Sequence, residues 1–203
     1  MTSKLEICKQ ALSLLHATNI NDFNDGSNNA NICNMHYDNH INNILALHSW
    51  SFATKKIKLT TSSNSNDDLF FKYMIDYPSD CINIISIVDS NKNLYDDYNI
   101  NISGNNIKQI YSNSNDLYLI YTTKTDESLW SNLFIKFAIY SFAVRICNPI
   151  KGNDRLEQEL YILTYGRNNN GGYYAEAYRN DVGQQPNNFE LEYNNNWVNA
   201  RYV

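Results

Sequence analysis

The spacing of apolar residues changes twice along this chain, and the change limits the folds that it can adopt. Toward both ends, apolar residues recur every three or four positions, as they do on one face of an α-helix. Between these parts, residues 52–123 contain short apolar runs separated by Asn, Ser, Asp and Gly, as in antiparallel strands joined by turns. The sequence therefore predicts a mainly helical α+β fold: a helical bundle with an inserted antiparallel β region and an extended C-terminal tail.

Four segments have the helical spacing, at about residues 3–16, 28–47, 128–147 and 153–165. The first begins with Ser3 and Glu6 in a capping-box arrangement, in which the serine hydroxyl bonds a free amide of the first turn. Ser27 and Asn153 are suitable caps for the second and fourth helices. Asp126 or Ser128 can begin the third helix, and Pro149 is expected to end it. Residues 173–180 can extend the helical part after the interruption at 168–172.

Six runs in the middle of the chain are predicted to be strands: residues 52–59, 69–75, 82–88, 98–102, 106–110 and 117–123. The segment Tyr77-Pro78-Ser79-Asp80 is typical of a turn, because proline fixes one backbone dihedral and Asp80 can bond nearby amides. We expect residues 1–180 to form a single domain with this β insertion.

The last segment, residues 181–203, differs in kind from the rest. It is too polar to form a core of its own, yet it contains scattered large apolar residues: Phe189, Leu191, Tyr193, Trp197 and Tyr202. Such a segment gains order by packing on another surface, either its own domain or a neighbouring molecule. We favour the neighbour, and we expect these five residues to be interface residues, with Trp197 filling a pocket on the partner.

Charge and cysteine content exclude several classes of protein. The net charge of −5 argues against a protein that grips phosphates or reads bases, although it suits one that surrounds passing DNA. The four cysteines, Cys8, Cys33, Cys81 and Cys147, are far apart and mostly lie in apolar runs, which is typical of free thiols in a reducing compartment. The N-terminus does not resemble a signal peptide, and no membrane span is predicted, so we expect synthesis in the cytoplasm.

No catalytic, cofactor or metal site is predicted. Cys33, His36 and His40 share one helix, but the outer two are about 10 Å apart along its axis, too far to share one zinc ion. The histidines have no nucleophile motif beside them, and no glycine-rich phosphate loop is present in the sequence. We therefore do not expect an enzyme.

The order of short motifs in the first half of the chain is more specific. An amphipathic helix with Ala11-Leu12-Ser13-Leu14-Leu15 precedes a loop with Ile20, Phe23 and Asp25 and a helix with Ala30, Cys33, Tyr37-Asp38 and Ile44-Leu45. Two sharper motifs follow: His48-Ser49-Trp50-Ser51-Phe52-Ala53 and Tyr77-Pro78-Ser79-Asp80-Cys81-Ile82. This order, over about residues 3–90, resembles the tail tubular protein A family, the head-to-tail adaptors of short-tailed phages, which includes the ring proteins of crAss-like phages.

The resemblance implies a structural virion protein of the phage neck. It implies a homo-oligomeric ring, commonly of twelve copies, held between the portal protein on one side and the tail nozzle or a second ring protein on the other. DNA would pass through the lumen without sequence-specific binding. In such a protein we expect Leu12, Leu15, Trp50, Phe52, Phe134 and Phe137 to be core residues. Contacts with neighbours would come from the β insertion and the C-terminal segment.

The chain departs from the family in two places. Only Ala175-Glu176-Ala177 remains of the alanine-rich run with which the family usually continues its last helix, and the final twenty or so residues are particular to this chain. The alternative function is a carbohydrate- or receptor-binding module of the virion, which the many aromatic residues would suit. A wall-degrading hydrolase of the neck comes third, because no pair of catalytic carboxylates can be placed.

Overall fold

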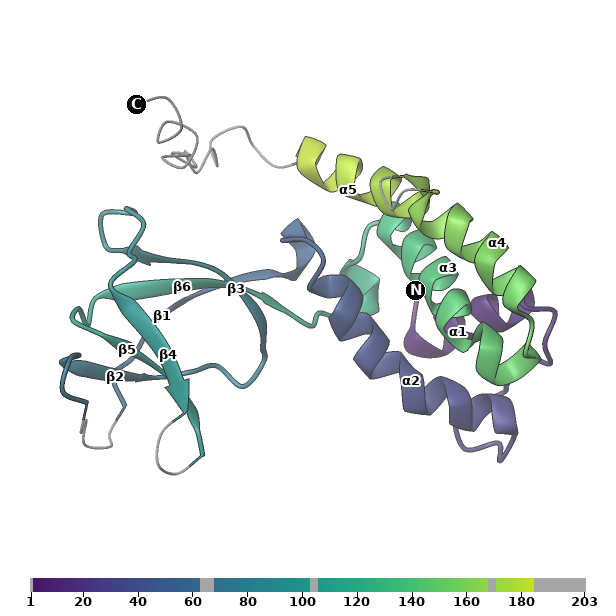
Figure 1. Cartoon of the computed structure of the whole chain (residues 1–203), viewed down its shortest axis with the longest axis horizontal. Helices are drawn as coiled ribbons and strands as arrows, with labels where there is room; N and C mark the ends of the chain where they lie inside the picture. Colours follow the sequence, from purple (N-terminus) through teal and green to yellow (C-terminus); the bar gives the residue numbers. More distant parts are fainter. Residues whose placement is uncertain (1, 63–67, 103–105, 168–170, 185–203) are drawn as a thin grey trace.

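A computed structural model describes residues 2–62, 68–102, 106–167 and 171–184 (Figure 1). Its helices and two small antiparallel sheets confirm the predicted mainly helical α+β class. The helices gather at one end of the molecule and the strands at the other, so the chain forms an elongated particle (Figure 1). We call these parts the helical body and the β body.

The helical body contains α1 (Lys4–Leu14), α2 (Asn28–Leu45), α3 (Asn132–Lys151), α4 (Asp154–Tyr165) and α5 (Gly172–Gln184). Three predicted caps are confirmed, because the side chains of Ser3, Ser27 and Asn153 accept backbone N–H bonds at the starts of α1, α2 and α4. The core cluster of this body includes Leu12, Leu15, Trp50, Phe134 and Phe137, all at most 1% exposed. Phe52 is half-buried and packs against the same cluster. The predicted core residues therefore lie together.

α3 differs from its prediction at both ends. Asp126 caps only a short 3₁₀ turn at Glu127–Leu129, and Ser131 caps α3 itself. At the other end, the helix continues through Pro149 to Lys151 and ends at Gly152, which has a left-handed backbone. Core packing of Ile146 and Ile150 on either side of the proline holds this last turn in place. Pro149 therefore does not break the helix.

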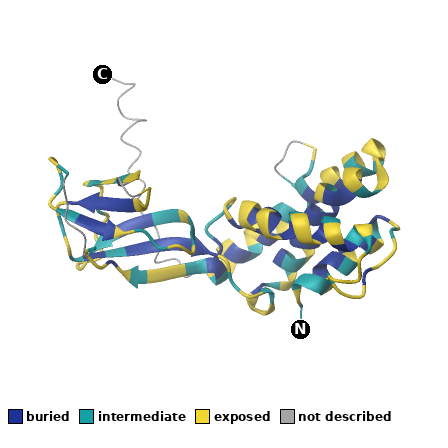
Figure 2. Cartoon of the chain, turned by 90° about the horizontal axis from the view of Figure 1, so that it is seen from below, coloured by how far each residue is buried: buried dark blue, intermediate teal, exposed yellow. Residues whose placement is uncertain are grey.

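α3 is also the central helix of its body, in contact with α1, α2, α4 and α5. Within the described residues, it is the one helix long and apolar enough to cross a bilayer, although no such span was expected from the sequence. Half of its apolar window is buried inside the protein, as in the core helix of a folded domain. Dark blue buried segments accordingly run through the middle of the helical body and along the sheets (Figure 2).

The β body consists of two three-stranded sheets. One has the order β1 (Thr54–Lys58), β6 (Leu117–Thr123), β3 (Cys81–Asp89), and the other has the order β2 (Tyr73–Asp76), β5 (Lys108–Ser112), β4 (Tyr98–Ile102). An isolated bridge pairs Thr61, just after β1, with Ile75 of β2, and another pairs Val88 of β3 with Leu94 in the loop that follows it. Both sheets contribute to one small core: Leu59, Ile75, Ile87, Ile110, Leu117, Leu119 and Tyr121.

The strand predictions are confirmed most closely at β4 and β6, whose bounds agree with the sequence pattern. The predicted strand at residues 69–75 is wrong in its first half, because Leu69 and Phe70 lie in bends before β2 and are exposed. The predicted strand at residues 52–59 begins two residues late, since Ser51–Ala53 forms a 3₁₀ turn.

Candidate functional site

The segment from His48 to Ala53 joins the two bodies. Trp50 is fully buried; its indole N–H donates to the Ile44 carbonyl (3.1 Å), and its ring lies 4.7 Å from that of Phe134. The Phe52 ring lies 4.7 Å from the same Phe134 ring and 6.0 Å from that of Trp50. Ala53 is buried at the point where the chain enters β1. This motif therefore fixes the β body to the helical core.

A buried carboxylate on α5 also holds this joint. Asp181, 3% exposed, accepts hydrogen bonds from the Ser51 backbone N–H (3.0 Å) and from the Ser51 hydroxyl (2.6 Å). His48 Nε2 lies 3.2 Å from the same carboxylate. The last turn of α5 is thus bound directly to the chain that leads into β1.

The predicted start of the C-terminal segment is wrong by four residues. The sequence placed the start of the C-terminal segment at residue 181, whereas α5 continues to Gln184 with Asp181 buried inside it. The reason is tertiary: the partners of Asp181 are 130 and 133 residues away in the chain. No local pattern in the sequence could indicate them.

The second motif, from Tyr77 to Cys81, links the two sheets. Asp80 accepts from Lys55 Nζ (2.8 Å), the Tyr121 hydroxyl (3.0 Å) and Thr123 Oγ1 (3.2 Å), and not from neighbouring amides as expected for a turn. The Lys55 ammonium beside it holds the pKa of Asp80 below its usual range. Tyr77 donates to Cys81 Sγ at 3.1 Å, and partial burial raises the pKa of that thiol. A protonated thiol is a poor nucleophile, so this cluster suits a structural role.

The metal-capable residues of α2 do not converge. Cys33 faces the Cys8 thiol of α1, while His40 Nε2 lies 3.0 Å from the Ser141 hydroxyl of α3. Among the described residues, no group of three or more His, Cys, Asp or Glu side chains is placed to hold a metal ion.

Exposed apolar residues gather at the end of the β body away from the helices. Leu69 is 93% exposed and Phe70 is 82% exposed, and we call this pair the distal tip. The tip has a defined backbone, because the Phe70 and Phe71 amides both donate to the Asp68 carboxylate, at 2.8 and 3.0 Å. The chain leading into β2 lies at the far end of the molecule in Figure 1. The sequence placed these two residues in a strand, and no local signal marks them as exposed.

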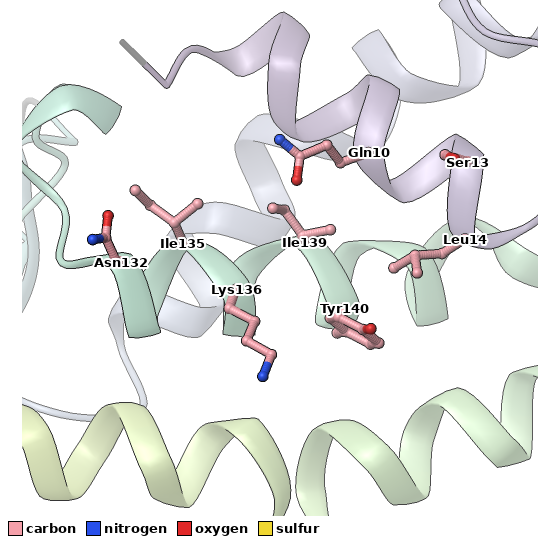
Figure 3. Close-up of a pocket in the computed structure, with 8 residues that line it drawn as sticks. All are labelled: Gln10, Ser13, Leu14, Asn132, Ile135, Lys136, Ile139 and Tyr140. Carbon is pink, nitrogen blue, oxygen red and sulfur yellow. The ribbon is translucent and has the colours of Figure 1, made fainter.

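The helical body also has an open groove between α1 and α3, with a volume of about 420 Å³ (Figure 3). Its lining combines aliphatic and polar side chains: Gln10, Ser13, Leu14, Asn132, Ile135, Lys136, Ile139 and Tyr140. Lys136 Nζ lies 3.9 Å from the ring centroid of Tyr173 on α5. Its lining holds no carboxylate or thiol to act as a base or nucleophile, so the groove suits packing of a protein segment better than catalysis.

The predicted interface residues of the tail, Phe189, Leu191, Tyr193, Trp197 and Tyr202, lie outside the described residues. Neither a protein-family model nor a curated protein sequence matches this chain. The site therefore rests on its own geometry: a packed and hydrogen-bonded joint between two bodies, an exposed apolar tip on the β body and a mixed groove on the helical body.

Proposed function

We propose that this chain is a structural subunit of the neck of a tailed phage, a head-to-tail adaptor that forms a ring between the portal and the tail. The observation that carries the proposal is the elongated two-body shape with apolar residues exposed at its far end (Figure 1). A subunit that connects two different components needs separated contact surfaces and a rigid connection between them. Leu69 and Phe70 supply one such surface, and the Trp50 and Asp181 contacts supply the connection.

The positions of the family-like motifs support the same proposal. The Trp50 motif joins the helical body to the β body, and the Tyr77–Cys81 motif joins the two sheets. Both motifs thus maintain the shape of the subunit and leave its surface free to contact neighbours. A ring of such subunits, commonly twelve, uses one patch of each subunit against a different patch of the next.

The charge of the chain agrees with a channel for DNA. Its net charge of −5 gives a ring of many copies a strongly acidic total charge. Phosphates are repelled by such a surface, so a duplex slides along it instead of binding to it.

Co-sedimentation with portal rings of the same virus tests the proposal. The full chain should pellet with the rings at a saturating, fixed ratio. In the Trp197→Ala variant, the loss of an aromatic anchor should weaken this binding by about 30-fold, as for a typical interface hot spot, and Trp197→Phe should keep most of it. A chain that stays in the supernatant, and instead binds oligosaccharides on a glycan array, would be a carbohydrate-binding module.

A further inference from the structure

β4 lies at the edge of its sheet, because β5 pairs with one of its sides and, within the described residues, no strand or isolated bridge lies on the other. Two other sheet edges are covered by the chain that adjoins them. The Ser62 amide donates to the Met74 carbonyl on β2 (2.7 Å), and the Tyr95 amide donates to the Ile87 carbonyl on β3 (2.9 Å). An edge without such a cover is a template for another strand, so β4 needs protection of a different kind.

The hydrogen bonds of the β4 amides show which of them face outward. The Tyr98 amide donates to the Asp96 carbonyl (2.9 Å). The Ile100 amide donates to the side-chain Oδ1 of the preceding residue, Asn99 (2.8 Å). These two amides therefore point away from β5. Because amides alternate in direction along a strand, the Ile102 amide points outward with them, and the amides of the two residues in between point toward β5.

The outward side of β4 has a pattern that suits pairing with β4 of a second copy. In an antiparallel pairing centred on Ile100, the two Ile100 residues would exchange both of their backbone hydrogen bonds. Tyr98 of each copy would then lie opposite Ile102 of the other, and pairs of an aromatic and a β-branched residue stabilise neighbouring strands. Ile102 is 67% exposed, so folding leaves most of its side chain accessible for such a contact.

The Asn99 side chain interferes with this pairing at its centre. Its Oδ1 already holds the Ile100 amide, which is the donor that the central pair of hydrogen bonds requires. A contact between two identical edges is related by a twofold axis, so the Asn99 contact would have to break in both copies. The strand is also short, at five residues, so few other hydrogen bonds are available to compensate for that loss.

We propose that the Asn99 side chain closes the β4 edge and so prevents it from pairing with β4 of a second copy. In the proposed ring, many copies of the chain lie close together, and sheet pairing between them would compete with the contacts that build the ring. The inference itself does not depend on the adaptor function, because every free copy of the chain has the same edge.

Sedimentation velocity of the full chain over a series of concentrations tests this role of Asn99. Valine cannot accept a hydrogen bond, so Asn99→Val frees the Ile100 amide in both copies of a pair. This variant should dimerise at concentrations at least about tenfold lower than Asn101→Val does. Asn101→Val is the matched control, because Asn101 is exposed on the same face of the same strand and its replacement leaves the Asn99 contact in place.

A second substitution shows whether the new dimer uses the β4 edge. Ile102→Pro removes an outward-facing donor and leaves the hydrogen bonds to β5 in place, as proline does on edge strands. Added to Asn99→Val, it should return the chain to a monomer. Equal association of Asn99→Val and Asn101→Val would overturn the proposal. An Asn99→Val dimer that persists with Ile102→Pro would overturn it as well, because the copies would then meet through another surface.

Discussion

At the scale of single residues, Gly172 is the position where the fold depends most clearly on one side chain being absent. It has a φ of +61°, and a Cβ there would lie 2.3 Å from the Leu163 carbonyl oxygen. Gly172→Ala should therefore lower the free energy of unfolding by roughly 2–4 kcal/mol in a urea titration. Gly183→Ala is the matched control on the same helix: a Cβ there meets nothing within 4 Å. It should raise stability by up to about 1 kcal/mol, and equal losses in both variants would contradict this account.

His40 makes the stability of the chain depend on pH. Burial, with a smaller effect of Arg145, lowers the pKa of His40 to about 4 from 6.5. Ser141 donates its own proton to the Ala138 carbonyl (3.1 Å), so neutral His40 is the donor to Ser141. The folded state keeps this ring neutral while the unfolded chain takes up a proton, so stability must fall as pH drops from about 6.5 to 4.

The size of this effect can be measured by comparison with a variant that lacks the ring. The lowering of the His40 pKa from 6.5 to about 4 corresponds to about 3 kcal/mol of folding stability, which is lost as the pH falls through that range. Urea titrations between pH 4 and 7.5 should show a shallower pH slope for His40→Gln than for the original chain. Parallel slopes for the two proteins would mean that His40 takes up its proton at the same pH in the folded state as in the unfolded chain, which would contradict the lowered pKa.

At the scale of elements, α5 depends on the Asp181 contacts for its position. Asp181→Ala leaves the Ser51 amide and hydroxyl without this buried acceptor, which should cost roughly 2–3 kcal/mol of stability. Glu176→Ala, at an exposed position of the same helix, should change stability by less than about 0.5 kcal/mol. Thermal unfolding measures both, and an Asp181→Ala chain as stable as the control would show that packing alone positions α5.

The elements also show which parts of the fold a sequence can predict. Helix starts at Ser3, Ser27 and Asn153 were predictable because a cap bonds amides only two or three residues away. The continuation of α3 through Pro149 was not, because core packing of Ile150 overrides a local preference. Two features of the candidate site could not be predicted either. Leu69 and Phe70 have a strand-like pattern whether buried or exposed, and the partners of Asp181 are far away in the sequence.

At the scale of the whole molecule, the distal tip is an apolar surface that folding leaves exposed to solvent. Leu69→Ser with Phe70→Ser removes two side chains that are 93% and 82% exposed, so monomer stability should stay within about 0.5 kcal/mol. If the tip contacts a neck component, binding to the portal or to the nozzle should weaken by tenfold or more. Exchanging Met35, an exposed residue (74%) of α2, for Ser provides the comparison. Equal binding by the tip variant and the original chain to both components would remove the tip from the interface.

The adaptor function itself is tested most directly by negative-stain imaging of the purified chain, alone and mixed with portal rings of the same virus. We expect a second ring of density on one face of the portal, with one elongated two-body subunit for each portal subunit. Portal rings that stay bare at saturating concentrations of the chain would contradict it.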